Sequence, residues 1–221
     1  MKFLEKLKMD LIVDSRDAYK EAILSLLERD EKACVLDLGC GDPRRLTYKV
    51  LDAIGTTEKA WGADLQHFKD DRIEIRHCEL GWSLPFSPGV DVIIASQIIE
   101  HLYNTDVFLK EIYRVLKPGG YAIVSTPNLA SWHNVLCLAL GGQPETAAVS
   151  DELYPWKETP GHLRAFTATE LVKLLEFHGF VVEKVVGSSY YPFPGRLARL
   201  LSKMDWKHAG TITVKARKGG K

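Results

Sequence analysis

Two glycines that flank a cysteine, Gly39-Cys40-Gly41, are the first residues in this sequence whose types and spacing suggest chemistry. They follow the apolar run from Val35 to Leu38, which predicts a buried strand that ends in a tight turn. Glycine allows the backbone to turn sharply and allows a ligand to approach it closely. We therefore expect a small molecule to bind where this strand ends.

The residues around the turn distinguish between the ligands that such turns bind. A dinucleotide-binding turn has a third glycine where this sequence has Arg44, and the Gly-Lys-Ser/Thr of a phosphate-binding loop is absent. Two acids lie nearby, because Asp37 precedes the turn and Asp64 follows the apolar run 59–63. An acid at the end of a second strand suits hydrogen bonds to ribose hydroxyls. The pattern predicts a nucleoside ligand with an uncharged ribose.

The composition agrees with an ordinary enzyme domain. A chain of 221 residues is long enough to bury a core in one domain. The formal net charge is zero, so no global field attracts nucleic acid. The four cysteines show no pairing pattern, which favours reduced thiols. The N-terminus lacks a signal-peptide core and no stretch is long enough to span a bilayer, so we expect a cytoplasmic protein.

Strands and helices alternate along the chain, which predicts a parallel sheet with crossover helices. A helical segment at about 1–30 precedes the first strand, and Thr167 and Glu170 have the spacing of a capping box that begins a later helix. Strands are expected at 33–38, 59–64, 72–78, 90–95, 121–125, 181–186 and 211–216. The last two have no ordinary βαβ crossover between them, so we expect an antiparallel pair at the end of the sheet.

The hydrophobic period is lost over about 129–166, and this stretch gathers aromatic residues and histidines. A long irregular insert in a compact domain is usually a lid or a binding loop. We therefore expect an irregular substrate insert within a single domain that spans residues 1–221. The candidate substrate residues, including two tyrosines that follow a late strand, are Trp132, His133, Tyr154, Trp156, His162, Tyr190 and Tyr191. The alternative is that these rings fill a second small core.

Taken together, the motifs resemble those of class I S-adenosylmethionine-dependent methyltransferases, in the small-molecule branch that includes enzymes of quinone biosynthesis. The matching segments are Val35 to Gly41, Asp64, Leu84-Pro85-Phe86, Glu100-His101-Leu102 and Arg114 to Gly120. The resemblance implies a three-layer, Rossmann-like, seven-stranded sheet that is mostly parallel, with a reversed last strand and helices on both faces. One departure is Pro43, where family members often have a third glycine; proline suits the first turn of a helix.

The resemblance also assigns the cofactor, S-adenosylmethionine, and the residues that bind it. Gly39, Cys40 and Gly41 lie against the methionyl part, and Asp37 reaches the amino group. Asp64 holds the ribose hydroxyls and Leu65 packs on the adenine. Near the adenine amino group lie Glu79 and Leu80, and near the methyl group lie Ser96 and Gln97.

The implied reaction is in-line attack of a nucleophile on a sulfonium methyl group, and a hydroxyl acceptor requires removal of a proton. His101 is the candidate base, with His133 and His162 as rivals, and a structural role for His101 is the plain alternative. We assign no metal. In some quinone-pathway relatives, however, the matching Glu-His pair helps to bind a divalent metal, an alternative that applies to Glu100 and His101.

We expect a small, aromatic or apolar acceptor, with oxygen or carbon favoured over nitrogen or sulfur. Nucleic-acid bases are disfavoured, because Ser96-Gln97-Ile98-Ile99 replaces the Asn/Asp-Pro-Pro-Tyr loop of many such enzymes. A catalytically inactive nucleoside-binding scaffold is one alternative, and an NAD-dependent oxidoreductase, disfavoured by Arg44, is another. The basic C-terminal segment from Arg196 onwards has leucines interleaved, so it is either a solvated helix face or a peripheral contact with an anionic membrane.

Overall fold

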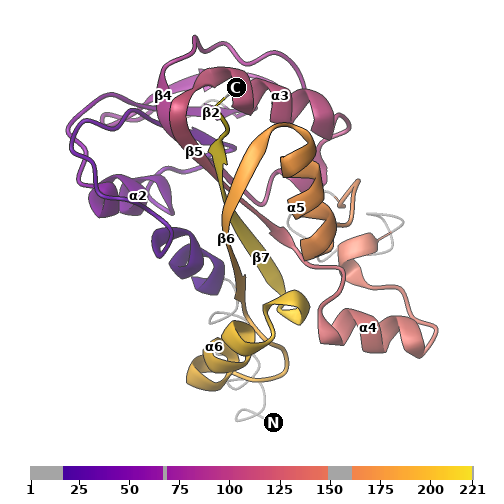
Figure 1. The fold of residues 1–221 in the computed structure, drawn as a ribbon. Coiled ribbons are helices and arrows are strands. Elements are labelled where there is room, and N and C mark those ends of the chain that lie inside the picture. The colour runs from indigo at the N-terminus through magenta and orange to yellow at the C-terminus, as the bar shows by residue number, and fades with distance from the viewer. Residues whose placement is uncertain (1–16, 67–68, 149–160, 221) are drawn as a thin grey trace.

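The computed structural model describes residues 17–66, 69–148 and 161–220. One seven-stranded sheet crosses the molecule with helices on both sides, in the strand order β3-β2-β1-β4-β5-β7-β6 (Figure 1). The strands are β1 (Val35–Leu38), β2 (Ala60–Asp64), β3 (Glu74–His77), β4 (Val90–Ser96), β5 (Leu116–Pro127), β6 (Phe180–Ser188) and β7 (Thr211–Lys218). Only β7 is antiparallel to its neighbours, β5 and β6. The expected mostly parallel sheet with a reversed last strand is confirmed.

Two hydrophobic layers cover the two faces of the sheet. On one face, α3 (Thr105–Val115) and α5 (Ala168–Phe177) pack against inward residues of β4 and β5 such as Ile93 and Val124. On the other face, the helical residues 17–24 and α2 (Thr47–Ile54) pack against Ile94 and Ile123. Successive side chains of a strand point to opposite faces, which is why neighbouring isoleucines of β4 belong to different layers.

Side-chain caps begin two of the helices, and the sequence predicted the first of these caps. The Thr167 side chain accepts a hydrogen bond from the Glu170 amide at the start of α5, and Gly179 after its end has a φ of 88°. In α3, the Asn104 side chain accepts from the Val107 amide. β5 begins directly after α3, so Pro118-Gly119-Gly120 lies within a strand rather than in a loop.

Two helices lie outside the alternation of strands and helices that the sequence pattern predicts, and the second occupies the basic segment from Arg196 onwards, where a helix face was one expectation. The helix α4 (Trp132–Ala139) occupies part of the stretch expected to be irregular; it is apolar on most sides, so it shows no clear period. A second helix, α6 (Gly195–Met204), connects β6 to β7. It remains at the end of the sheet where β6 ends and β7 begins, so the connection does not cross the sheet and the antiparallel pairing holds (Figure 1).

In the part of the chain that the structure describes, no helix is both long enough and apolar enough to cross a membrane.

Candidate functional site

The order in which successive strands join the sheet reverses at β1, because β1 pairs with β2 on one side and with β4 on the other. In open parallel sheets such a reversal leaves a crevice outside the carboxyl ends of the strands. The turn after β1 faces this crevice, and Gly39 and Gly41 have φ values of 74° and 52°. A Cβ on Gly39 would lie 2.2 Å from Cδ1 of Ile98. Glycine is therefore required at position 39 both by its backbone conformation and by the side chain of Ile98.

The turn is bonded to the end of β2. The Gly39 amide donates to the Ala63 carbonyl at 2.7 Å. The Asp64 carboxylate accepts from the Gly41 amide and from the Gln66 amide, each at 2.9 Å. Each carboxylate oxygen thus has one backbone donor and keeps a second lone pair for a ligand. Asp64 is held in one orientation at the crevice.

A cavity of about 450 Å³ lies beside this turn. Six predicted residues line it: Gly39, Asp64, Leu65, Glu79, Leu80 and His101. The wall also contains residues that the sequence analysis did not assign to the site: Gly81, Trp82, Ile98, Leu102, Tyr103 and Asn104. Trp82 and Tyr103 are 67% and 81% exposed, so their rings border the opening. The sequence did contain a signal for these two residues, because Trp82 lies close to Glu79 along the chain and Tyr103 lies close to His101.

Asp37 is not part of this wall. Its carboxylate is buried and accepts a hydrogen bond from the Thr47 hydroxyl at 2.7 Å, at the start of α2. Burial raises the pKa of Asp37 to about 7, and the Thr47 hydrogen bond opposes the rise. The predicted contact between Asp37 and a cofactor amino group stays a prediction.

Cys40 and Gly41 also lie outside the lining of the cavity. Burial raises the pKa of the Cys40 thiol to about 12, so this cysteine is a neutral packing residue rather than a nucleophile. In the part of the chain that the structure describes, all four cysteines are unpaired, as expected.

Ser96 is the last residue of β4 and Gln97 follows it, and both contact β5 instead of the cavity. The Ser96 hydroxyl lies 3.2 Å from the Ser125 hydroxyl, and the side-chain amide of Gln97 donates to that same hydroxyl at 3.2 Å. Gln97 has a φ of 55°, an uncommon value for a residue other than glycine. Their predicted proximity to the methyl group stays a prediction.

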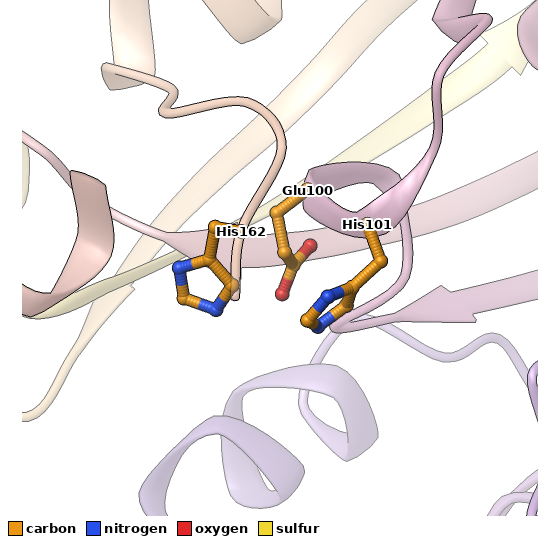
Figure 2. A group of neighbouring side chains, drawn as sticks. All are labelled: Glu100, His101 and His162. Atoms are coloured by element: carbon orange, nitrogen blue, oxygen red, sulfur yellow. The ribbon is translucent and has the colours of Figure 1, made fainter. Parts of the chain in front are cut away.

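Glu100, His101 and His162 form a cluster beside the cavity. One potential ligand atom from each of the three side chains lies within 4.8 Å of the other two. Glu100 and His101 belong to the short helix η1 (Ile99–His101), and His162 comes from the far end of the aromatic insert. Figure 2 shows the Glu100 carboxylate between the two imidazole rings, whose centroids are 5.0 Å apart. Two of the three candidate bases are thus brought together.

The Glu100 carboxylate is buried, with 1% of the residue exposed. Neither of its oxygens has a hydrogen-bond partner of good geometry among the described residues. Burial raises the pKa of Glu100 to about 7, and the backbone amide and the neighbouring Thr126 side chain oppose the rise. A buried carboxyl group without a partner is costly, so such a group indicates a role in binding or proton transfer.

Backbone hydrogen bonds hold His162 next to η1. The amides of Leu163 and Arg164 both donate to the Glu100 carbonyl, at 2.9 and 3.1 Å. The Nδ1 atom of His162 lies 3.2 Å from the Thr146 carbonyl, which only accepts hydrogen bonds. Nδ1 is therefore the protonated nitrogen of this pair, and the neutral ring carries its lone pair on Nε2. Bases and metal-binding histidines are oriented by the same kind of contact.

The other described aromatic candidates gather elsewhere, around Asp205 after α6. Trp132 Nε1 and the Tyr190 hydroxyl both donate to this carboxylate, at 2.8 and 2.6 Å. The rings of His133 and Tyr191 are in contact, with centroids 5.7 Å apart. None of the four lines the cavity. Tyr154 and Trp156 lie outside the described residues.

Comparison with known proteins gives a consistent result. The family model described as "Methyltransferase domain" matches residues 13–185. The chain is 34% identical over 145 residues to a Mycolicibacterium smegmatis protein named "Probable S-adenosylmethionine-dependent methyltransferase", covering 64% of this chain and 45% of that protein. It is 32% identical over 175 residues to the mitochondrial ubiquinone biosynthesis O-methyltransferase of Rattus norvegicus, covering 73% and 48%. The chain thus spans about half the length of these relatives.

A shorter relative is covered more completely. The ubiquinone biosynthesis O-methyltransferase of Caulobacter sp. is 28% identical over 212 residues, which cover 88% of this chain and 80% of that protein.

Solved structures share the fold. An S-adenosylmethionine-dependent methyltransferase from Mesorhizobium loti superposes with a TM-score of 0.61 at 17% identity, covering 89% of this chain and 96% of that one. A Burkholderia thailandensis 1,6-didemethyltoxoflavin-N1-methyltransferase with bound S-adenosylhomocysteine superposes with a TM-score of 0.57 at 19% identity, covering 99% and 86%.

Proposed function

Because the chain belongs to the methyltransferase-domain family and uses S-adenosylmethionine as its cofactor, we propose that it methylates a hydroxyl oxygen of a small acceptor. The names of the ubiquinone O-methyltransferase relatives support oxygen as the acceptor atom. The observation that carries the proposal is the cluster of Glu100, His101 and His162 beside the cavity. A hydroxyl is a poor nucleophile until its proton is removed, and this cluster offers groups that remove it.

The residues of the cavity fit the cofactor. The two unused lone pairs of the Asp64 carboxylate suit the two hydroxyls of a ribose, and the Glu79 carboxylate suits an exocyclic amine. Leu65 and Leu80 supply the apolar surface that an adenine ring requires. When bound, S-adenosylmethionine supplies an electrophilic methyl group.

The cluster itself performs the proton transfer. The imidazole of His101 lines the cavity and accepts the proton of the acceptor hydroxyl. The Glu100 carboxylate, which lies between the two histidines, stabilises the imidazolium that forms (Figure 2). His162 presents a ring nitrogen whose lone pair is fixed by the Thr146 contact. The exposed rings of Trp82 and Tyr103 also line the cavity and offer apolar surface to a flat acceptor.

A divalent cation is a second candidate for the same three side chains. The unpartnered oxygens of Glu100 favour it, because one carboxylate and two imidazoles suit Zn²⁺, Mn²⁺ or Fe²⁺. Such a cation would hold the acceptor oxygen and lower its pKa. Glu100, His101 and His162 would then be ligands.

The test is release of S-adenosylhomocysteine from S-adenosylmethionine with a panel of phenols and catechols as acceptors. His101→Ala should lower turnover by about 100-fold or more, while affinity for the methyl donor changes little. His178→Ala is the matched control, because His178 contacts Asp106 on α3 and lies outside the cavity wall. If EDTA abolishes the activity and Mn²⁺ restores it, the three side chains bind a divalent cation. If EDTA leaves the activity unchanged, His101 acts as the base without a metal.

Two outcomes would contradict O-methylation. The first is a product methylated only on carbon, nitrogen or sulfur. The second is donor binding without turnover for every acceptor, which would favour the inactive nucleoside-binding scaffold.

A further inference from the structure

The helix α6 contacts the domain through its small residues. Ala198 and Ser202 are the residues it buries, and they lie four apart on one face. Its large apolar residues Leu197, Leu200 and Met204 are 47%, 55% and 75% exposed. They have the spacing i, i+3 and i+7, so they form one exposed stripe beside the buried face. A helix that stabilises only its own domain would bury this stripe.

The helix α4 likewise exposes its large apolar side chains. The one residue that it buries is Asn134, whose side chain donates to the Asn128 carbonyl and to the Thr146 hydroxyl. Leu136 and Leu138 are 60% and 50% exposed, and Leu140 directly after the helix is 78% exposed. The helix contains no Asp, Glu, Lys or Arg.

The two helices lie at the same end of the sheet (Figure 1). Trp132, at the start of α4, donates to Asp205 after α6 and stacks on His208 with the ring centroids 4.4 Å apart. We call five exposed apolar residues of the two helices, Leu197, Leu200, Met204, Leu136 and Leu138, the apolar end surface. Exposed large apolar side chains that gather at one end of a protein often mark a surface that binds something.

Basic side chains border this surface. Arg196, Arg199 and Lys203 also have the spacing i, i+3 and i+7, one residue ahead of the apolar stripe, and all are exposed. The helix α6 contains no acidic residue. Arg199 is within 3.4 Å of Glu21 in an exposed pair, which leaves Arg196 and Lys203 as the basic residues beside Leu197 and Leu200. An apolar stripe next to a basic stripe is the pattern of helices that lie in a membrane interface.

We infer that the apolar end surface binds an anionic lipid bilayer, with α6 lying in the headgroup region. The charge pattern selects this partner. Because the chain has no net charge, the attraction comes from the local basic stripe rather than from the whole molecule. In a contact between two copies through α6, basic stripes without acidic partners would face each other, which is unfavourable.

The test is flotation of the full chain with vesicles of equimolar phosphatidylglycerol and phosphatidylcholine, compared with vesicles of phosphatidylcholine alone. Binding is expected to the anionic vesicles and to weaken when salt is raised to about 0.5 M. Leu197→Ser with Leu200→Ser should weaken binding about tenfold, and Arg196→Gln with Lys203→Gln by about fivefold or more. Phe177→Ser, on the distant helix α5, is the matched control because Phe177 is 80% exposed, and it should bind as the native chain does.

Thermal unfolding of each variant is the control for folding. Because the changed side chains are exposed, each variant should unfold at nearly the same temperature as the native chain. Absence of binding to anionic vesicles would overturn the inference, as would binding that the leucine variant leaves unchanged. Sedimentation that reveals a dimer, abolished by Leu197→Ser with Leu200→Ser, would assign the surface to a second copy of the chain and also overturn it.

Discussion

Two buried carboxyl groups differ in how they are satisfied, although burial raises the pKa of both to about 7. Asp37 has a hydrogen bond from Thr47, whereas Glu100 has no partner of good geometry among the described residues. Asp37 therefore acts within the fold by joining β1 to α2. Glu100 is therefore the group that we expect to bind a ligand or to accept a proton.

A pH dependence of stability follows from Asp37. Its pKa in the folded state lies above the ordinary 3.8, so the folded state binds the proton more tightly than the unfolded state. The contribution to the free energy of unfolding therefore falls as pH rises from about 4 to about 7, and it stays low at higher pH. Asp37→Asn removes this loss and retains an acceptor for Thr47. The advantage of the variant in free energy of unfolding should be larger at pH 8 than at pH 5 by about 2.5 kcal/mol.

Urea unfolding of the ligand-free protein at the two pH values measures this difference. Asp71→Asn, at an exposed position, is the control and should show no such trend. An advantage of Asp37→Asn that is equal at both pH values would contradict the raised pKa.

At the scale of elements, local signals predicted those helices whose caps are in the sequence. Thr167 and Glu170 indicated the start of α5, and the Thr167 side chain does accept from the Glu170 amide. The helix α4 was not predicted because it exposes its leucines and buries Asn134, so the usual apolar period does not mark its inner face. The helix α6 occupies the basic segment that was expected to be a helix face or a membrane contact, and it buries Ala198 and Ser202.

The cap of α5 is testable. Thr167→Ala removes the hydrogen bond to the Glu170 amide and should lower the free energy of unfolding by about 1 kcal/mol. Thr169→Ala, at an exposed position in the first turn of the same helix, should change it by only a few tenths of a kcal/mol. Equal effects of the two substitutions in chemical denaturation would show that the cap contributes nothing.

At the scale of the whole molecule, the sheet order places the end of β1 between β2 and β4 and so creates the crevice. Binding of the methyl donor there should stabilise the entire domain. At a donor concentration of about 100 times its dissociation constant, the gain is about 2.7 kcal/mol, or a rise in Tm of about 5–10 °C. NAD should give no rise, since Arg44 stands where a dinucleotide-binding turn has glycine.

The same measurement tests Asp64. Asp64→Ala should weaken donor binding by about 1–3 kcal/mol because the ribose hydroxyls lose their acceptor. The rise in Tm at a fixed donor concentration should then shrink, whereas Asp71→Ala should keep the full rise. A full rise with Asp64→Ala would remove the ribose assignment.

The succession of strands along the chain and the residues of the glycine turn after β1 were determined by the sequence itself. Hydrophobic runs that end at Leu38 and Ala63 and glycines at positions 39 and 41 are local features, and neighbouring residues are enough to express them. Other features required the folded chain. Sequence spacing indicated neither the approach of His162 to Glu100 and His101 nor the exposure of Leu136 and Leu138 on α4. Contacts between segments far apart in the chain depend on which element packs on which. Only tertiary structure decides that, because it determines which faces are buried and which remain open to a partner.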